Sequence, residues 1–213
     1  MKRIVVVAIV LGLAVLAAPV PTGAQTNLIV VSDTTWTVRA ISNTLPTGVG
    51  RAEAVCVNAV VPPNCPPDAV LYGAAADWFA DLSSIPGAMW IWARGINGST
   101  SPADLQTFWF SKVIYLPAEP LTGSISIAAD DYAEITVNGQ LVAAYGSVTQ
   151  RGAAVHAHNS LRKYSVKDFL HKGSNQIVIR AQNGPSSFTE GGCNPCDYAE
   201  NPAGVVFGLN ITY

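Results

Sequence analysis

Two adjacent carboxylates, Asp130 and Asp131, are the residues most suggestive of chemistry in this sequence. An acidic pair that cleaves a glycosidic bond must face one substrate from positions several ångströms apart, with divergent pKa values. The residues around this pair are typical of strands, and neighbouring side chains of an extended chain point to opposite faces. We therefore expect the two carboxylates to support a turn by accepting N–H hydrogen bonds. A calcium ligand role for one of them is the alternative.

The histidines His156 and His158 form a second candidate group, within the polar stretch 148–160. If that stretch is an extended loop or irregular strand, both rings lie on one face, as in a two-ligand metal arm. The sequence assigns no third ligand, and the stretch is equally consistent with a solvated edge or a rim that hydrogen-bonds sugar hydroxyls. We expect no cofactor and no metal, with a structural calcium ion as the alternative.

Four cysteines form two local pairs, Cys56 with Cys65 and Cys193 with Cys196. An even number of cysteines in an exported chain favours disulfides. Three pairings are open, and the local one is favoured because each bond would staple its own loop. A four-cysteine zinc site and a redox pair are the alternatives.

The N-terminus indicates export. Lys2 and Arg3 precede an apolar run, and a segment of small residues follows that ends at Ala24. This is the layout of a cleaved signal peptide. Removing residues 1–24 lowers the 12 basic residues to 10, against 14 acidic ones. The resulting net charge of about −4 predicts binding to neither nucleic acid nor an anionic membrane. We expect a secreted or cell-surface protein with a single domain over 25–213.

Short apolar or alternating runs separated by Gly, Pro and Asn predict an all-β sandwich or barrel. We expect strands near 27–41, 89–93, 107–117, 123–129, 132–138, 140–145, within 164–183 and over 203–213, with a helical turn at 166–171. Asn138-Gly139 predicts a two-residue hairpin turn, because a type I′ turn requires positive φ at both central residues. Trp36, Trp90, Trp92 and Trp109 lie in apolar strands and are expected in the core.

The order of these segments resembles galactose-binding-like jelly-roll domains over residues 28–41 and 88–213, whereas 42–87 diverges. The matching motifs are "AADDYAEITVNGQ", "GSNQIVIRAQN" and the final strand. The resemblance implies a jelly-roll β-sandwich of the kind that accompanies secreted bacterial glycoside hydrolases and in many cases binds carbohydrate. It also implies structural turn roles for Asp130, Asp131, Asn138, Gly139, Asn175 and Asn183.

For function we expect a secreted, non-catalytic carbohydrate-binding or adhesive module for extracellular glycans. Aromatic rings in loops would stack on sugar faces, and the candidates are Tyr72, Trp78, Tyr145 and Tyr198, with His156 and His158 as polar neighbours. A structural subunit of an extracellular filament or surface layer, whose partners would be copies of itself, is the alternative. A hydrolase is the weakest hypothesis, because acidic residues such as Asp77, Asp81, Glu134 and Glu190 are scattered.

Overall fold

Buried and exposed side chains alternate along the strands of the protein. The computed structural model describes residues 25–40, 49–57, 70–72, 78–93, 103–188, 193 and 200–213, so the signal peptide predicted over 1–24 lies outside them. In strand β8, Tyr132–Val137, every second side chain is buried, and β11, Gly173–Gln182, alternates in the same way over most of its length. This pattern gives each strand one face for the core and one for solvent.

Antiparallel pairing joins most of the described strands into one curled sheet that folds into two layers. The remaining strands are β1 Asn27–Val31, β2 Thr37–Ala40, β3 Val49–Val57, β4 Val70–Tyr72, β5 Ile91–Ala93, β6 Thr107–Leu116, β7 Thr122–Asp130, β9 Gln140–Gly146, β10 Arg162–Ser165 and β12 Gly204–Thr212. The described residues also contain helix α1, Arg151–Asn159, and two short 3-10 helices, Lys167–Phe169 and Ser186–Phe188. The prediction of an all-β sandwich is therefore confirmed.

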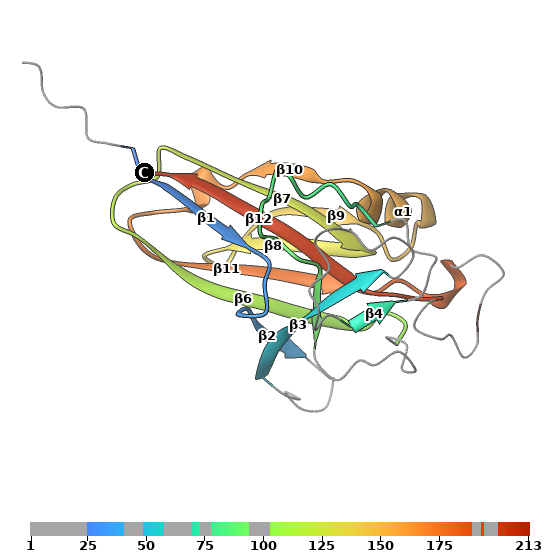
Figure 1. Cartoon of the computed structure of the whole chain (residues 1–213). Coiled ribbons are helices and arrows are strands. Elements are labelled where there is room, and N and C mark those ends of the chain that lie inside the picture. The colour runs from blue at the N-terminus through green and yellow to red at the C-terminus, as the bar shows by residue number, and fades with distance from the viewer. Residues whose placement is uncertain are drawn as a thin grey trace, which may run out of the picture.

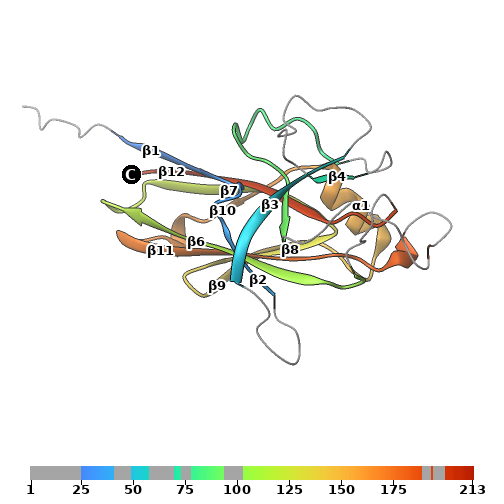
Figure 2. The same ribbon diagram turned by 60° about the horizontal axis from the view of Figure 1, so that its bottom comes forward.

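The two layers meet through β3. One layer contains β10, β7, β12, β1 and β5, and the other has the order β2-β6-β11-β8-β9. The first part of β3 pairs with β2 and its middle pairs with β5, so this strand crosses from one layer to the other (Figure 2). On the opposite side, α1 packs against β7 and β9 and covers the seam between the two layers (Figure 1). The sandwich is consequently almost closed.

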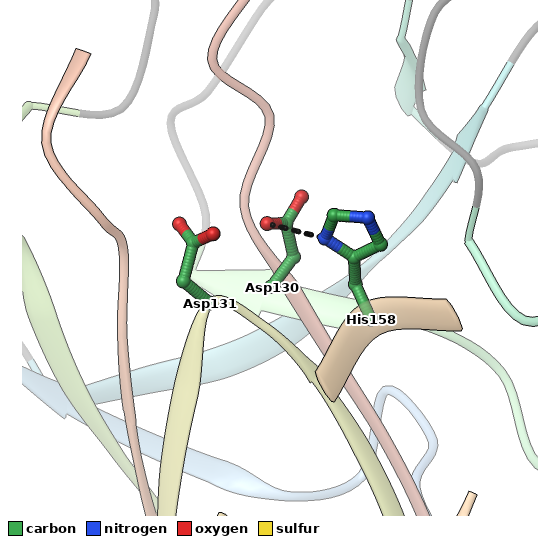
Figure 3. A group of neighbouring side chains, drawn as sticks. All are labelled: Asp130, Asp131 and His158. Carbon is green, nitrogen blue, oxygen red and sulfur yellow. Dashed lines mark hydrogen bonds and ion pairs between the residues drawn. The ribbon is translucent and has the colours of Figure 1, made fainter. Parts of the chain in front are cut away.

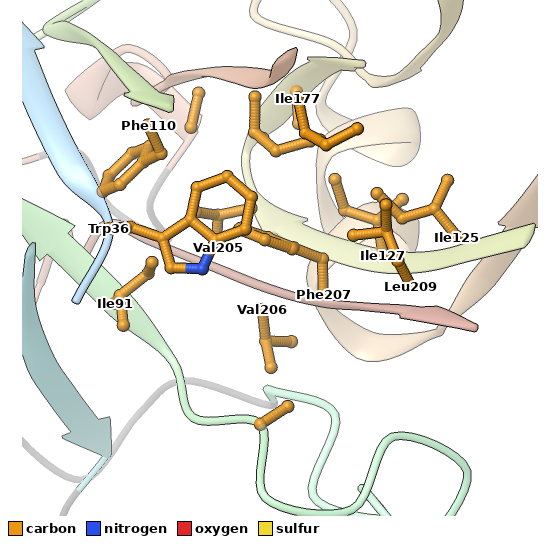
Figure 4. Packing of buried hydrophobic residues seen from close by; sticks show 14 of the residues in the cluster. Trp36, Ile91, Phe110, Ile125, Ile127, Ile177, Val205, Val206, Phe207 and Leu209 are labelled. Carbon is orange, nitrogen blue, oxygen red and sulfur yellow. The ribbon is translucent and has the colours of Figure 1, made fainter. Parts of the chain in front are cut away.

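Aromatic and branched side chains from both layers fill the space between them. Trp36 and Phe207 are fully buried and meet edge to face, with ring centroids 4.7 Å apart. Phe110 of β6 and the isoleucines of β7 and β11 complete this packing (Figure 4). The predicted burial of Trp36, Trp90 and Trp92 is confirmed.

The stretch 148–160 was expected to be an extended or irregular loop, and that expectation is wrong. Residues 151–159 form helix α1, in which Ala154 and Ala157 are buried. Alanine has the highest helix propensity, and its small side chain allows the helix to lie close to the sheet. Of the polar residues that suggested a loop, Arg151, His156 and Asn159 are exposed on this helix, whereas His158 is half-buried.

The predicted hairpin turn is present, and buried asparagine side chains make hydrogen bonds near it and elsewhere in the sheet. Asn138 and Gly139 have φ angles of 51° and 79°, as a type I′ turn requires. The Asn138 side chain donates to the carbonyl oxygen of Phe169 at 2.8 Å and to Asn175 Oδ1 at 2.9 Å. Asn183 is also buried, and its side chain donates to the carbonyl oxygen of Ala103 at 3.2 Å.

Asn175 is the most connected of these supports and is fully buried. Its amide donates to the carbonyl oxygens of His171 and Gly173, and its Oδ1 accepts the backbone N–H of His171. These bonds hold the bend through which the chain enters β11.

We expect Asn175→Ala to lower the free energy of unfolding by about 3 kcal/mol, because several buried polar groups would lose their partners. Urea unfolding followed by tryptophan fluorescence measures the change. Gln176→Ala is the matched control, since Gln176 is exposed on the same strand, and its effect should stay within about 0.5 kcal/mol. Equal, small effects of both variants would contradict the assigned role.

Candidate functional site

Asp130, Asp131 and His158 meet at the end of the sandwich. Asp130 is the last residue of β7, Asp131 lies in the turn before β8, and His158 comes from α1. The two carboxylates are only 5% and 7% exposed. One metal-ligating atom from each residue lies within 4.8 Å of the other two (Figure 3). We call these three residues the Asp–Asp–His cluster.

This geometry corrects the expectation that Asp130 and Asp131 point to opposite faces. Strand alternation applies only while the chain is extended, and Asp131 lies between β7 and β8. The peptide bond between the two residues is cis. The carboxylates lie side by side, with Asp130 between Asp131 and His158 (Figure 3).

Each carboxylate is fixed by an N–H donor from a distant segment. The indole Nε1 of Trp78 donates to Asp130 Oδ2 at 2.7 Å. The backbone N–H of Gly184 donates to Asp131 Oδ2 at 2.6 Å. Asp130 Oδ1 lies 3.3 Å from Nδ1 of His158. The expected hydrogen-bonding role is therefore present, but the donors lie far away in the sequence rather than in the local turn.

Three glycines leave the space that the cluster and its supports occupy. A Cβ at Gly184 would overlap Asp131 Oδ2, and one at Gly146 would overlap the carbonyl oxygen of Asp131. A Cβ at Gly204 would lie 2.6 Å from the ring of Trp78. Gly146 also has a φ of 85°, which favours glycine. Backbone from three further segments thus closes around the two carboxylates.

Burial and the neighbouring carboxylate of Asp130 raise the pKa of Asp131 to about 9. Removal from water disfavours the charged form, and a second negative charge nearby disfavours it further. Asp131 therefore carries a proton at neutral pH when no cation is present. Oxygens of the two carboxylates lie within 4.8 Å of one another, whereas the two carboxyl groups that act from the two sides of a glycosidic bond lie about 5 Å or more apart.

The histidine pair is separated by the helix. Residues two apart in an α-helix are about 200° apart around its axis, so His156 and His158 cannot share a face. His156 is exposed, whereas His158 faces Asp130. The arrangement of both rings on one face, which an extended stretch would give, is therefore absent, and His158 contacts Asp130 instead.

Two aromatic residues that were expected to stack on sugars have structural contacts instead. Trp78 is buried and stacks on Trp90, with ring centroids 4.3 Å apart. Tyr145 is half-buried, and its hydroxyl lies 2.7 Å from Oγ of Ser160 and donates to the carbonyl oxygen of His156 at 3.1 Å. Trp78 is therefore not an exposed ring, whereas the ligand role of Tyr145 stays a prediction.

Other predicted site residues are only partly described. The backbone of Tyr72 lies in β4 and that of Cys56 in β3, but their side chains are outside the description. Tyr198, Cys65 and Cys196 lie outside the described residues altogether. Cys193 is disulfide-bonded, and its predicted pairing with Cys196 remains a prediction.

A second candidate site lies on the outer face of β6. Here Trp109, Ser111, Val113 and Tyr115 alternate with the inward-facing Phe110, Ile114 and Leu116. Val113 and Tyr115 are 65% and 66% exposed. We define the β6 surface as these four outward residues together with Thr37, Gln176 and Arg180, which pair with them across the sheet.

Polar groups surround the rings of the β6 surface. Arg180 lies 5.8 Å from the ring centroids of both Trp109 and Tyr132, and its Nη1 donates to Glu134 Oε1 at 2.8 Å. The Tyr132 hydroxyl donates to the same oxygen at 2.7 Å. Burial, followed by the Glu134 contact, raises the pKa of Tyr132 to about 12, so this hydroxyl keeps its proton. Glu134 therefore holds the guanidinium of Arg180 near the indole of Trp109.

A hollow of about 330 Å³ opens on the same face. Its lining consists mainly of hydroxyl, amide and cationic side chains, namely Thr35, Thr37, Arg51, Ser111, Lys112, Val113 and Gln176. Trp109 and Tyr115 flank this lining along β6, about 20 Å apart at the rise of an extended strand. Two rings with hydrogen-bonding groups between them form a surface suited to an elongated polar ligand.

Sequence reasoning missed this surface, because Trp109 was expected in the core and is half-exposed. The segment "TFWFSKVIYL" is apolar on both sides of the strand for several residues, which obscures its alternation. The alternation of Phe108 and Phe110 with Trp109 was the available signal.

The sequence is partly similar to that of an α-L-rhamnosidase from Streptomyces avermitilis, with 28% identity over 104 residues that cover 48% of this chain and 10% of the enzyme. A crystal structure of that α-L-rhamnosidase with L-rhamnose aligns at 24% identity and a TM-score of 0.43, over 57% of this chain and 10% of that one. A β-glucuronidase from Ruminococcus gnavus aligns at 11% identity and a TM-score of 0.42, over 92% of this chain and 30% of that one. No family model matches.

This chain thus spans about a tenth of the length of the curated relative that it matches. Its similarity is to parts of glycoside hydrolases. Among the described residues, no helix has both the length and the apolar character needed to cross a membrane.

The raised pKa of Asp131 predicts a pH-dependent stability. The ordinary pKa of this group is 3.8 and its value in the folded protein is about 9, so the folded chain keeps a proton that the unfolded chain loses between these values. Stability should therefore fall as the pH rises through this window. Asp131→Asn removes the titration and should be more stable than the wild type at about pH 8, by roughly 1 kcal/mol or more.

Urea unfolding at about pH 5 and pH 8, in EDTA, measures this difference. Asp168→Asn is the control, because Asp168 is an exposed aspartate, and it should follow the pH dependence of the wild type. The prediction fails if Asp131→Asn and the wild type lose stability in parallel as the pH rises.

Proposed function

We propose that this protein is a secreted, non-catalytic module that binds extracellular glycans through the β6 surface. The observation that carries the proposal is the row of Trp109 and Tyr115 on either side of a hollow lined by hydroxyl and amide groups. Sugar rings combine apolar C–H faces with many hydroxyl groups, so they are bound by flat aromatic rings and by hydrogen-bonding side chains together.

The shape of the surface favours an oligosaccharide over a single sugar. The two rings are separated by most of the length of β6, and the polar groups lie between them rather than in one deep pocket. The fixed guanidinium of Arg180 offers N–H donors beside the indole of Trp109. A chain of sugars lying along β6 would contact both rings and the hollow at once.

Two further observations support a glycan-related role outside the cell. The relative from S. avermitilis is an α-L-rhamnosidase, and the matched part covers half of this chain. Residues 1–24 have the layout of an export signal. Rhamnose-containing oligosaccharides are therefore the first ligands to test.

A structural subunit of an extracellular filament or layer is the second candidate. Val113 and Tyr115 are strongly exposed on the β6 surface, and Leu141 of β9 is 61% exposed in the same layer. Exposed apolar side chains on a sheet mark contact surfaces for other chains as well as for ligands. The neighbouring copy would then occupy the surface that we assign to glycan.

We expect Trp109→Ala and Tyr115→Ala each to weaken glycan binding by about tenfold or more, because each variant removes one stacking ring. A glycan array identifies the ligand, and calorimetry with that oligosaccharide measures the affinities. Leu121→Ala is the control, since Leu121 is also exposed but lies near the end of β12 in the other layer, and its affinity should be unchanged.

Two results would count against the glycan proposal. One is an array of plant, microbial and host glycans without binding by the folded wild type. The other is a concentration-dependent assembly that Tyr115→Ala abolishes, measured by light scattering, since this outcome supports the structural role.

A further inference from the structure

We propose that the Asp–Asp–His cluster binds one divalent cation of the Zn²⁺ or Mn²⁺ class. This site is separate from the β6 surface, and the inference does not rest on the proposed function. Its ligands are Asp130, Asp131 and His158, which arrive from β7, the following turn and α1.

The donor atoms already converge without an ion. Asp130 Oδ1 and His158 Nδ1 are 3.3 Å apart. Two ligands of a tetrahedral ion with bonds of about 2.0 Å lie roughly 3.3 Å apart, so this pair has the spacing that a shared metal requires. All three donor atoms lie within 4.8 Å of one another, so they would have to move closer together when an ion binds.

The outer hydrogen bonds of the cluster leave one oxygen of each carboxylate for an ion. Trp78 and Gly184 each donate to an Oδ2 atom, as outer-shell partners of metal ligands do. Such partners fix the orientation of a ligand before the ion arrives. Because the donors are an indole N–H and a backbone N–H, neither adds a positive charge that would compete with a cation.

The site is also mixed in chemistry and open on one side. Two carboxylate oxygens with one imidazole nitrogen suit Zn²⁺ and Mn²⁺, whereas Ca²⁺ takes six to eight oxygen ligands. The carboxylates are nearly buried, but the His158 side chain is 15% exposed and provides the approach from solvent. An ion with three protein ligands there would keep at least one position for water.

Such an ion would join the turn after β7 to α1. It would replace the proton of Asp131 as the compensating positive charge and hold the helix against β7 and β9. An ion that binds only the folded chain stabilises it by mass action. We therefore expect the melting temperature to rise by about 5 °C at saturating zinc.

The experiment uses the tag-free protein, stripped with EDTA and titrated with ZnCl₂ or MnCl₂ in a calorimeter. We expect one ion per chain and the corresponding rise in melting temperature. Asp131→Asn and His158→Ala should each weaken binding by at least tenfold, and His156→Ala, the matched control on the same helix, should bind as the wild type does.

Melting of each variant in EDTA shows that a loss of binding is not a loss of fold. Asp131→Asn is the decisive variant, because an amide can still accept the hydrogen bond from Gly184 while losing the charge. Absence of binding by the folded wild type would overturn the proposal. Unchanged stoichiometry and affinity in both Asp131→Asn and His158→Ala would do the same, because the ion would then lie elsewhere.

Discussion

The burial of two neighbouring carboxylates at one end of the sandwich is the constraint around which this structure is organised. A charge taken out of water is costly unless it is paired or neutralised, so both carboxylates need partners. Trp78, Gly184 and His158 supply those partners from three segments that are distant in sequence. The cluster therefore ties α1 and the segment before β5 to the end of the sheet, where glycines at 146, 184 and 204 allow the backbone to approach.

The aspartate pair is also connected, through β11, to the outer face of the other layer. The backbone N–H of Asp131 donates to the carbonyl oxygen of Gln182 at 3.2 Å, at the point where β8 pairs with the end of β11. Two residues earlier on β11, Arg180 lies between the rings of Trp109 and Tyr132. A fixed end of the β8–β11 pair thus sets the position of the side chains that flank the β6 surface. The buried cluster and the exposed surface belong to one connected sheet.

Much of this fold could be predicted from the sequence, because the signals for it are local. Alternation of apolar and polar residues predicts β7, β8 and β9 almost to their ends. The Asn138-Gly139 pair predicts the turn between β8 and β9 without any contact to distant residues. Helix α1 was missed because its alanines are compatible with a loop as well as with a helix. Only packing against β7 and β9 decides between these states.

The candidate sites were harder to predict, because they depend on contacts between distant residues. The residues around Asp130 do not predict that Trp78 donates to it or that His158 faces it. The turn at Asp131 also breaks the alternation rule from which opposite faces were inferred. Trp109 was assigned to the core because an apolar strand looks buried on both faces, although its partners Arg39 and Arg180 mark that face as an outer one.

We infer that the buried aspartate pair holds one compensating positive charge, either a proton or a cation. The most direct measurement is ¹³C NMR of the side-chain carboxyls of labelled aspartate at about pH 7. In EDTA, we expect one aspartate with the chemical shift of a protonated acid, absent from Asp131→Asn and converted to the ionised form by zinc. Ionised carboxyls for every aspartate of the folded, metal-free protein would contradict it.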